Sequence, residues 1–173
     1  MALRDLFTSQ SLNQAFPSRL PGTAKGWDTS STNREVAIDP SVEATVELLP
    51  SNPVKLSGKA GQMKYVEPCT SSDDVVYGFI IYKAKNFINN VGYNRMATVG
   101  REYQEMDFAF KAPIVAGATV YVDTADGFAT GTPSATTVVA GLAVETVAAA
   151  TAAAPVVACV EIQCPRVVVA AAA

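Results

Sequence analysis

The chain of 173 residues contains no histidine, and this absence removes a large group of reaction chemistries. Without an imidazole there is no Ser–His or Cys–His couple and no histidine ligand for a metal ion. Acid–base chemistry would have to rest on carboxylates, lysine or tyrosine. Charged residues are also scarce, at 17% of the chain against roughly 25% in an average soluble protein. A surface so poor in charge is often partly covered by partners.

Cysteine occurs only three times, as Cys69, Cys159 and Cys164, and this odd number does not form a disulfide framework. A reducing compartment is therefore expected. Cys159 lies within an apolar run, so we expect it in the core as a small hydrophobic residue. Without histidine, the three cysteines fall short of the four ligands of a typical zinc site. The sequence predicts no bound metal and no cofactor.

Long hydrophobic runs are missing as well. The longest uncharged apolar stretch, 146–160, is too short to cross a bilayer and contains Pro155. The N-terminal MALRDLFTSQ lacks the apolar region and the cleavage site of a secretion signal. The net charge is −3, and no region has the clustered Lys and Arg of a nucleic-acid-binding surface. We therefore expect neither a membrane nor a nucleic acid as a partner.

The middle of the chain carries a mild excess of positive charge. The simplest interpretation is a set of solvated lysines on edge strands. The alternative is a docking face for an acidic partner surface. The lysines concerned are Lys55, Lys59, Lys64, Lys83 and Lys85.

Residues 1–35 are expected to form an extended N-terminal arm, in which Pro17, Pro21, Gly22 and Gly26 repeatedly interrupt the chain. So polar a segment cannot bury enough apolar surface to fold alone. It nevertheless carries large apolar residues that could anchor in grooves of another protein. These candidate contact residues are Leu6, Phe7, Phe16, Leu20 and Trp27. The alternative is an arm that packs back on its own domain.

From residue 36 onward the sequence alternates with the period of β-strands. The first such segment, 36–49, places Val42, Ala44, Val46 and Leu48 on one face before Pro50 ends it. Turn signals about every 8–12 residues are typical of an all-β barrel or sandwich. We expect one compact β-domain over 36–169 and a frayed tail at 170–173. Further alternating segments lie at 54–57, 61–68, 75–85, 95–100, 102–112, 113–124, 136–147 and 154–164.

Two of these strands have strongly apolar faces. Met106, Phe108 and Phe110 share one face of the first, and Val156, Ala158, Val160 and Ile162 share one face of the second, so both are expected to line the core. Gly141 marks a bend in the strand between residues 136 and 147. The alanine-rich run 147–154 is too short for an independent helix, so we expect a loop or a single helical turn there.

Candidate catalytic groups are weak throughout the chain. The neighbouring acids Glu102 and Glu105, and Asp73 and Asp74, are typical of solvated turns and strands. The segment 123–128, DTADGF, has the aspartates and glycine of a calcium loop but lacks its ligand spacing, so a hairpin turn is expected. Six tyrosines could stack on sugars or single-stranded nucleic acid, but we expect them at the rim of the barrel: Tyr65, Tyr77, Tyr82, Tyr93, Tyr103 and Tyr121. We expect no catalytic residue.

The β-region resembles the structural cement, or head-decoration, proteins of tailed bacteriophages. The resemblance depends on the order and spacing of small-residue strands over roughly residues 54–162. The N-terminal arm and the Val/Ala tail depart from the family pattern. The segments concerned are VKLS (54–57), VVYGFII (75–81), AGATVYVDTADGFAT (116–130), VVAGLAVETV (138–147) and PVVACVEI (155–162).

The resemblance implies a virion protein without an active site. Such proteins bind the outer surface of an expanded capsid, commonly as oligomers at local symmetry axes, and hold neighbouring major capsid proteins together. The expected partners are the major capsid protein and further copies of this chain, with a homotrimer favoured. The expected location is the outer surface of the capsid, after synthesis in the host bacterial cytoplasm.

Two other function classes remain open from the sequence. A carbohydrate- or receptor-binding β-module of a phage tail or virion would need exposed aromatic residues clustered on loops. A small polysaccharide lyase that uses tyrosine and lysine ranks last.

Overall fold

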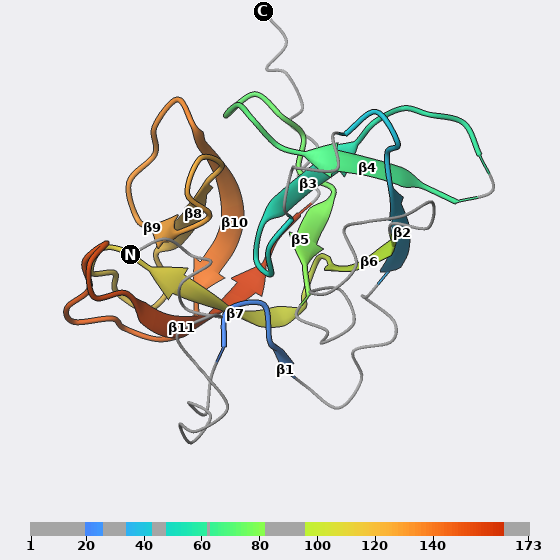
Figure 1. Ribbon diagram of the computed structural model, residues 1–173. Coiled ribbons are helices and arrows are strands. Elements are labelled where there is room, and N and C mark those ends of the chain that lie inside the picture. The colour runs from blue at the N-terminus through green and yellow to red at the C-terminus, as the bar shows by residue number, and fades with distance from the viewer. Residues whose placement is uncertain (1–19, 26–33, 43–47, 62, 82–95, 165–173) are drawn as a thin grey trace, which may run out of the picture.

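The computed structural model describes residues 20–25, 34–42, 48–61, 63–81 and 96–164. These residues form β-strands, turns and loops and contain no helix, which confirms the predicted all-β class. The strands make two closed arrangements that lie side by side, joined where the chain passes from β6 to β7 (Figure 1). Strands β2–β6 form the first, and β1 together with β7–β11 forms the second.

The first arrangement is a closed five-stranded barrel, called here the small barrel. Its strands follow the order β2-β4-β3-β5-β6, with β2 parallel to β4 and the other pairs antiparallel. Closure leaves none of its strands with an open edge. The strands are β2 (Arg34–Ile38), β3 (Pro53–Leu56), β4 (Tyr65–Pro68), β5 (Gly78–Ile80) and β6 (Met96–Gly100).

Alternation of apolar residues explains the interior of the small barrel. Val36 and Ile38 of β2 point inward, and Val54 and Val66 from the neighbouring strands are fully buried. The interior is a cluster of mainly aliphatic side chains that also takes in one aromatic ring. Its buried members are Val36, Ile38, Leu48, Val54, Val66, Tyr77, Ile80, Ala97 and Val99.

The second arrangement is a curled sheet in the order β1-β7-β11-β10-β8-β9. An additional parallel pairing of Phe110 with Ala129 joins β9 back to β7. Strands β7, β11, β10, β8 and β9 therefore close on themselves, and they are called here the second ring. The strands are β1 (Ala24–Lys25), β7 (Glu105–Phe110), β8 (Thr119–Asp123), β9 (Ala129–Thr130), β10 (Thr137–Ala143) and β11 (Val156–Ile162).

The second ring is tightly packed, and Gly141 shows how tightly. The pairing of β10 with β8 shifts register between Val139 and Gly141, which confirms the predicted irregularity at this glycine. A Cβ atom at Gly141 would lie 1.8 Å from the backbone oxygen of Glu161 on β11. Only glycine allows the two strands to approach so closely.

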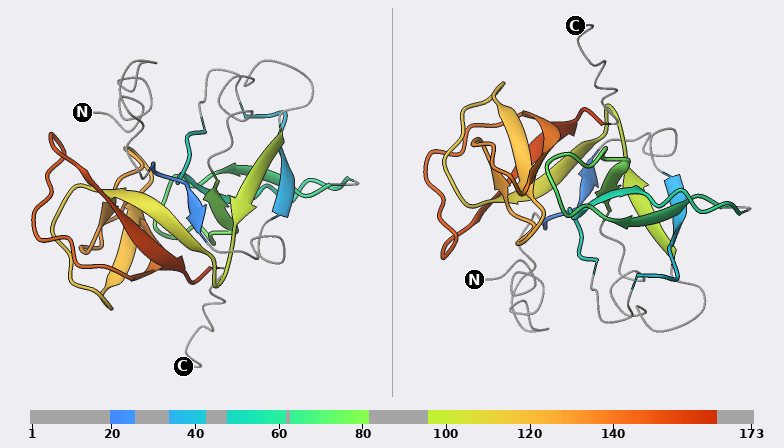
Figure 2. Two further views of the ribbon diagram at one scale, coloured as in Figure 1. Left: turned by 90° about the horizontal axis from the view of Figure 1, so that it is seen from below. Right: turned by 90° about the horizontal axis from the view of Figure 1, so that it is seen from above.

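One large core connects the two arrangements. The ring of Phe79, from the small barrel, meets the ring of Phe108, from β7, edge to face with centroids 5.2 Å apart. Cys69, Val76 and Ile81 from the N-terminal half join the same cluster. The apolar interior of the second ring therefore continues into the wall of the small barrel. The two arrangements also lie side by side in two further views (Figure 2).

The predicted strand 36–49 differs from the structure. Strand β2 ends at Ile38, and the chain then turns at Asp39–Ser41, where the Ser41 amide and hydroxyl donate to Asp39 Oδ1 at 2.8 and 2.7 Å. An Asp–Pro step favours such a turn, because proline cannot donate to a strand ladder. Residues 43–47 lie outside the described residues, and so does the predicted tail from 165 onward.

Candidate functional site

Most of the predicted contact residues of the arm lie outside the described residues. Leu6, Phe7, Phe16 and Trp27 belong to this group. Leu20 is described and is half-buried, and its carbonyl accepts a hydrogen bond from the Thr23 amide at 3.1 Å. The role of these five residues as anchors on another protein therefore stays a prediction.

A short part of the predicted arm lies on the chain's own sheet. Strand β1 pairs antiparallel with β7, with Ala24 opposite Met106 and Lys25 opposite Glu105. The Gly22 amide donates to the Asp107 carbonyl at 2.6 Å, and the Asp107 amide donates to the Thr23 carbonyl at 2.9 Å. Strand β2 also begins at Arg34, within the sequence range assigned to the arm. The apolar contacts of Ala24 with the large core explain why this segment packs inward.

Two loops at the end of the second ring away from the small barrel lie against each other (Figures 1 and 2). These loops, 112–118 and 144–155, together with Val156 at the start of β11, are called here the apolar loop face. Ile114 and Val147 form an isolated bridge with reciprocal backbone hydrogen bonds of 3.0 and 2.8 Å. The Ala116 amide donates to Thr146 Oγ1 at 3.1 Å, and the Gly117 amide donates to the Ala143 carbonyl at 2.7 Å. The loops are therefore fixed to each other by hydrogen bonds.

The apolar loop face exposes large aliphatic side chains. Val115 is 67% exposed, Val144 is 45% exposed and Val156 is 38% exposed. Ala148, Ala149 and the alanines 152–154 are also exposed between them. Glu145 is the sole charged residue in the two loops, and its Oε1 accepts from the Cys159 amide at 3.1 Å. Exposed apolar residues that cluster on ordered loops make this face a candidate interaction surface.

The sequence prediction missed this face, although a signal for it was present. No lysine or arginine occurs between residues 112 and 165. The predicted loop at 147–154 is confirmed as irregular, and it folds against a second loop that the strand pattern could not place beside it. Long-range contacts of this type depend on sheet register, which a single sequence does not show.

The acidic turn at 123–128 confirms the predicted hairpin between β8 and β9. The Lys111 ammonium donates to Asp123 Oδ2 at 2.8 Å and to Asp126 Oδ2 at 2.7 Å. Burial alone would lower the pKa of Lys111, but these two carboxylates outweigh it and raise that pKa. The Lys111 side chain thus neutralises two carboxylates of the turn and links the turn to the end of β7.

A mixed acid–thiol group lies on the second ring. The ligand atoms of Asp107, Glu145 and Cys159 lie within 4.8 Å of one another, and Asp107 is the register partner of Cys159. Two carboxylates and a thiolate could coordinate a divalent metal ion. The same groups already take part in hydrogen bonds of the sheet, such as the one from the Cys159 amide to Glu145. The group therefore also has a structural role as a polar contact between strands.

All three cysteines are buried and free, and the core position predicted for Cys159 is confirmed. Burial raises the pKa of the Cys69 thiol to about 12, and burial raises the pKa of the Cys164 thiol to about 12 as well. A thiol with such a pKa stays protonated at neutral pH and is a poor nucleophile. These two cysteines therefore behave as small core residues.

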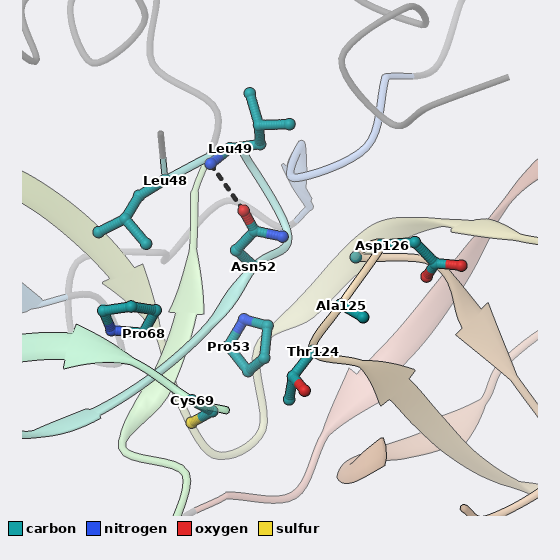
Figure 3. A pocket seen from close by; sticks show the side chains of 10 residues that line it. Leu48, Leu49, Asn52, Pro53, Pro68, Cys69, Thr124, Ala125 and Asp126 are labelled. Carbon is teal, nitrogen blue, oxygen red and sulfur yellow. Dashed lines mark hydrogen bonds between the residues drawn. The ribbon is translucent and has the colours of Figure 1, made fainter. Parts of the chain in front are cut away.

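Two hollows open beside these thiols. The first, with a volume of about 190 Å³, lies between the 48–53 segment of the small barrel and the β8–β9 turn (Figure 3). Leu48, Pro53 and Pro68 form part of its wall, and Asn52 Oδ1 accepts from the Leu49 amide at 2.8 Å. The second, of about 420 Å³, is lined by Ser72, Asp73, Asp74, Val75, Val76, Val139, Gln163 and Cys164.

The described tyrosines do not gather on one surface. Tyr103 is 72% exposed, whereas Tyr77 is 5% exposed and does not lie at the rim as predicted. The Arg101 guanidinium carbon lies 4.5 Å from the Tyr77 ring centroid, and Lys64 Nζ lies 5.2 Å from it. Two cations from distant parts of the chain therefore lie over this ring. Tyr82 and Tyr93 lie outside the described residues.

The acidic pairs singled out in the sequence are either hydrogen-bonded or exposed. Asp74 Oδ1 accepts from Lys55 Nζ at 2.7 Å, and its Oδ2 accepts from the Thr70 and Ser71 amides at 2.7 and 3.0 Å. Asp73, Glu102 and Glu105 are exposed. Lys55 also lies 3.5 Å from Glu67, so this lysine serves an ion-pair network at the edge of the small barrel.

Comparisons with known proteins add no relative. Neither a scan against models of protein families nor a search of curated protein sequences finds a match to this chain. Among the described residues there is no helix with the length and apolar character needed to cross a membrane.

Proposed function

We propose that this chain is a capsid cement protein, which binds the outer surface of a phage head and clamps neighbouring major capsid proteins. The observation that carries the proposal is the apolar loop face, where Val115 and Val144 are exposed on loops fixed by hydrogen bonds and Val156 is exposed at the start of β11. A surface that is apolar, almost uncharged and already ordered loses little conformational entropy when it binds another protein. The order of strand segments that resembles cement proteins supports a capsid as the partner.

A fixed lattice of capsid subunits suits a binding surface of this modest size. Several copies of the chain, joined as an oligomer with a trimer favoured, would meet several capsid subunits at once. The second and third contacts then form at high effective concentration, so each single contact can be weak. Binding that exists only on the assembled shell stabilises the shell by mass action.

Electron microscopy of the full chain mixed with purified undecorated heads tests the proposal. We expect extra density at regular positions on the outer surface, and a rise in the temperature at which the heads disrupt. Heads that remain bare at a saturating concentration of the protein would contradict the proposal. A glycan array distinguishes the alternative of a carbohydrate-binding module, which would retain labelled protein on particular sugars.

A further inference from the structure

The two closed arrangements leave few strand edges free. Each of the strands β2–β11 has a hydrogen-bonded neighbour on both sides. Among the described strands, β1 alone pairs on one side, with β7. A partner that adds a strand to this protein would therefore have to bind β1 or take its place on β7.

The edge of β7 is divided between two short strands. Its C-terminal end pairs with β9 through Phe110 and Ala129, and its N-terminal end pairs with β1 through Glu105 and Met106. The gap between them is filled by backbone bonds from Gly22 and Thr23 to Asp107. Residues 22–25 thus complete the edge that β9 leaves open (Figure 1).

This gap needs an occupant. Asp107 is 1% exposed, and both its amide and its carbonyl bond to the segment 22–25. If the segment left without replacement, a buried donor and a buried acceptor would lose their partners, and each loss costs about 1–3 kcal/mol. The arm cannot leave this site to bind elsewhere unless another strand enters.

We propose that the β7 edge at Glu105–Asp107 is a strand-acceptor site, which in the oligomer receives residues 22–25 of a neighbouring copy. This inference rests on the proposed function, in which several copies of the chain join as an oligomer. Exchange between identical copies keeps every hydrogen bond of the site and changes only the path of the connecting chain. Residues 26–33 join β1 to β2. A segment of this length reaches at most roughly 25–30 Å, which limits the exchange to copies whose β7 edge lies within that distance.

Cysteine cross-linking across the register pair Lys25 and Glu105 tests the exchange. Directly opposite Cα atoms in an antiparallel pair lie about 4.5–5.5 Å apart, which is within the range of about 4.4–6.8 Å for a disulfide. One full-length chain carries Lys25→Cys and another, with a different tag, carries Glu105→Cys. Both also carry Cys159→Ala, because Cys159 Sγ lies 3.9 Å from Glu105 Oε2 and would compete.

After mixing and mild oxidation we expect a disulfide-linked species with both tags, at twice the mass of one chain. The matched control replaces Glu105→Cys by Thr132→Cys, on an exposed turn, and should give no such species. A single chain with both Lys25→Cys and Glu105→Cys tests the acceptor site itself. If this chain closes fully within itself while the mixture stays uncross-linked, exchange is overturned.

An absence of cross-links in both experiments would overturn the acceptor site as well. The test uses no capsids, so its outcome is independent of the proposed function. Heads that are decorated by a protein with no exchange would leave the cement function standing and remove only the inference on the arm. Exchange by a protein that does not decorate heads would leave the inference on the arm standing and remove the cement function.

Discussion

The small barrel and the second ring are both closed five-stranded structures, yet they differ in what they present to solvent. Around the small barrel, Lys55 pairs with Glu67 and Asp74, and Lys64 and Arg101 cover Tyr77. In the sequence that follows Lys111, the second ring and its loops contain no basic residue up to Cys164. The first region therefore carries a solvated charged surface, whereas the second carries an apolar face in which Glu145 is the one charged residue.

The interiors also differ. The small barrel encloses mostly valine and isoleucine, with Tyr77 as its buried aromatic residue, while the large core of the second ring contains Phe79, Phe108 and Phe110. Phe79 comes from the small barrel itself. The second ring is therefore the main source of apolar burial, and we expect the stability of the small barrel to depend on this shared core. Changes at several places in the chain test this expectation.

The largest effect is expected at Gly141. Gly141→Ala would place a Cβ atom 1.8 Å from the Glu161 oxygen and would force β10 away from β11. We expect a loss of at least about 4 kcal/mol in the free energy of unfolding, measured by urea denaturation. Gly131→Ala is the matched control, because its Cβ would meet Ile114 at an ordinary 3.5 Å. Equal stability of the two variants would contradict the tight packing of the second ring.

A slightly smaller effect is expected from Phe79→Ala. Removal of the ring opens a cavity against Phe108 and should cost about 3–5 kcal/mol. Because Phe79 belongs to a barrel strand but lies in the large core, hydrogen exchange should speed up in both β3 and β7. Faster exchange in β3 with unchanged protection in β7 would show that the small barrel is independent of the second ring.

Two truncations of the N-terminus distinguish the contribution of β1 to stability from that of the residues before it. Deletion of residues 1–19 leaves β1 in place, so we expect little change in the free energy of unfolding. Deletion of residues 1–25 removes both backbone partners of Asp107 and should cost about 2–6 kcal/mol. Thermal unfolding monitored by circular dichroism measures both. Two truncations with the same Tm would mean that β1 contributes nothing to the edge of β7.

The smallest effect is expected at Asp39, at the end of β2. The hydrogen bond from Ser57 contributes most to lowering the pKa of Asp39, and the hydrogen bonds from Ser41 add to it. Together they hold this pKa at about 2, below its ordinary 3.8. The folded state therefore binds fewer protons than the unfolded state between these values, and the stabilisation present above pH 4 is lost as pH falls toward 2. Asp39→Asn should show a smaller drop in Tm across this window than the wild type.

The variant Ser57→Ala removes one of these hydrogen bonds, because the Ser57 hydroxyl donates to Asp39 Oδ2 at 2.6 Å. We expect an acid dependence between those of the wild type and Asp39→Asn. If all three proteins lose Tm in parallel as the pH falls, Asp39 does not contribute to the acid stability of the small barrel.

The sequence predicted the fold class well because its signals are local. The inward faces of Met106, Phe108 and Phe110 are confirmed, and each of these side chains is fully buried. The turn at 123–128 and the irregularity at Gly141 are confirmed for the same reason, since aspartate and glycine set local backbone geometry. The exposure of Val156 was missed, because an alternating pattern does not show where a sheet ends.

The candidate surface could not be predicted to the same degree. The apolar loop face depends on Ile114 pairing with Val147, and the site on β7 depends on Gly22 and Thr23 reaching Asp107. Both are contacts between segments far apart in the chain. The sequence contains a stretch without basic residues and an arm with turn-forming glycines. It does not show which residues lie next to these segments in space.

A sedimentation measurement tests the proposal that the apolar loop face binds a capsid. Wild-type protein, Val115→Asp and Val75→Asp are each spun with purified undecorated heads, and the protein in the pellet is measured. Val75, at 63% exposed, matches Val115 at 67% but lies in the 72–76 loop outside the apolar loop face. We expect Val115→Asp to bind about 30-fold more weakly or worse and Val75→Asp to bind like the wild type. Equal binding of the two variants would contradict the account.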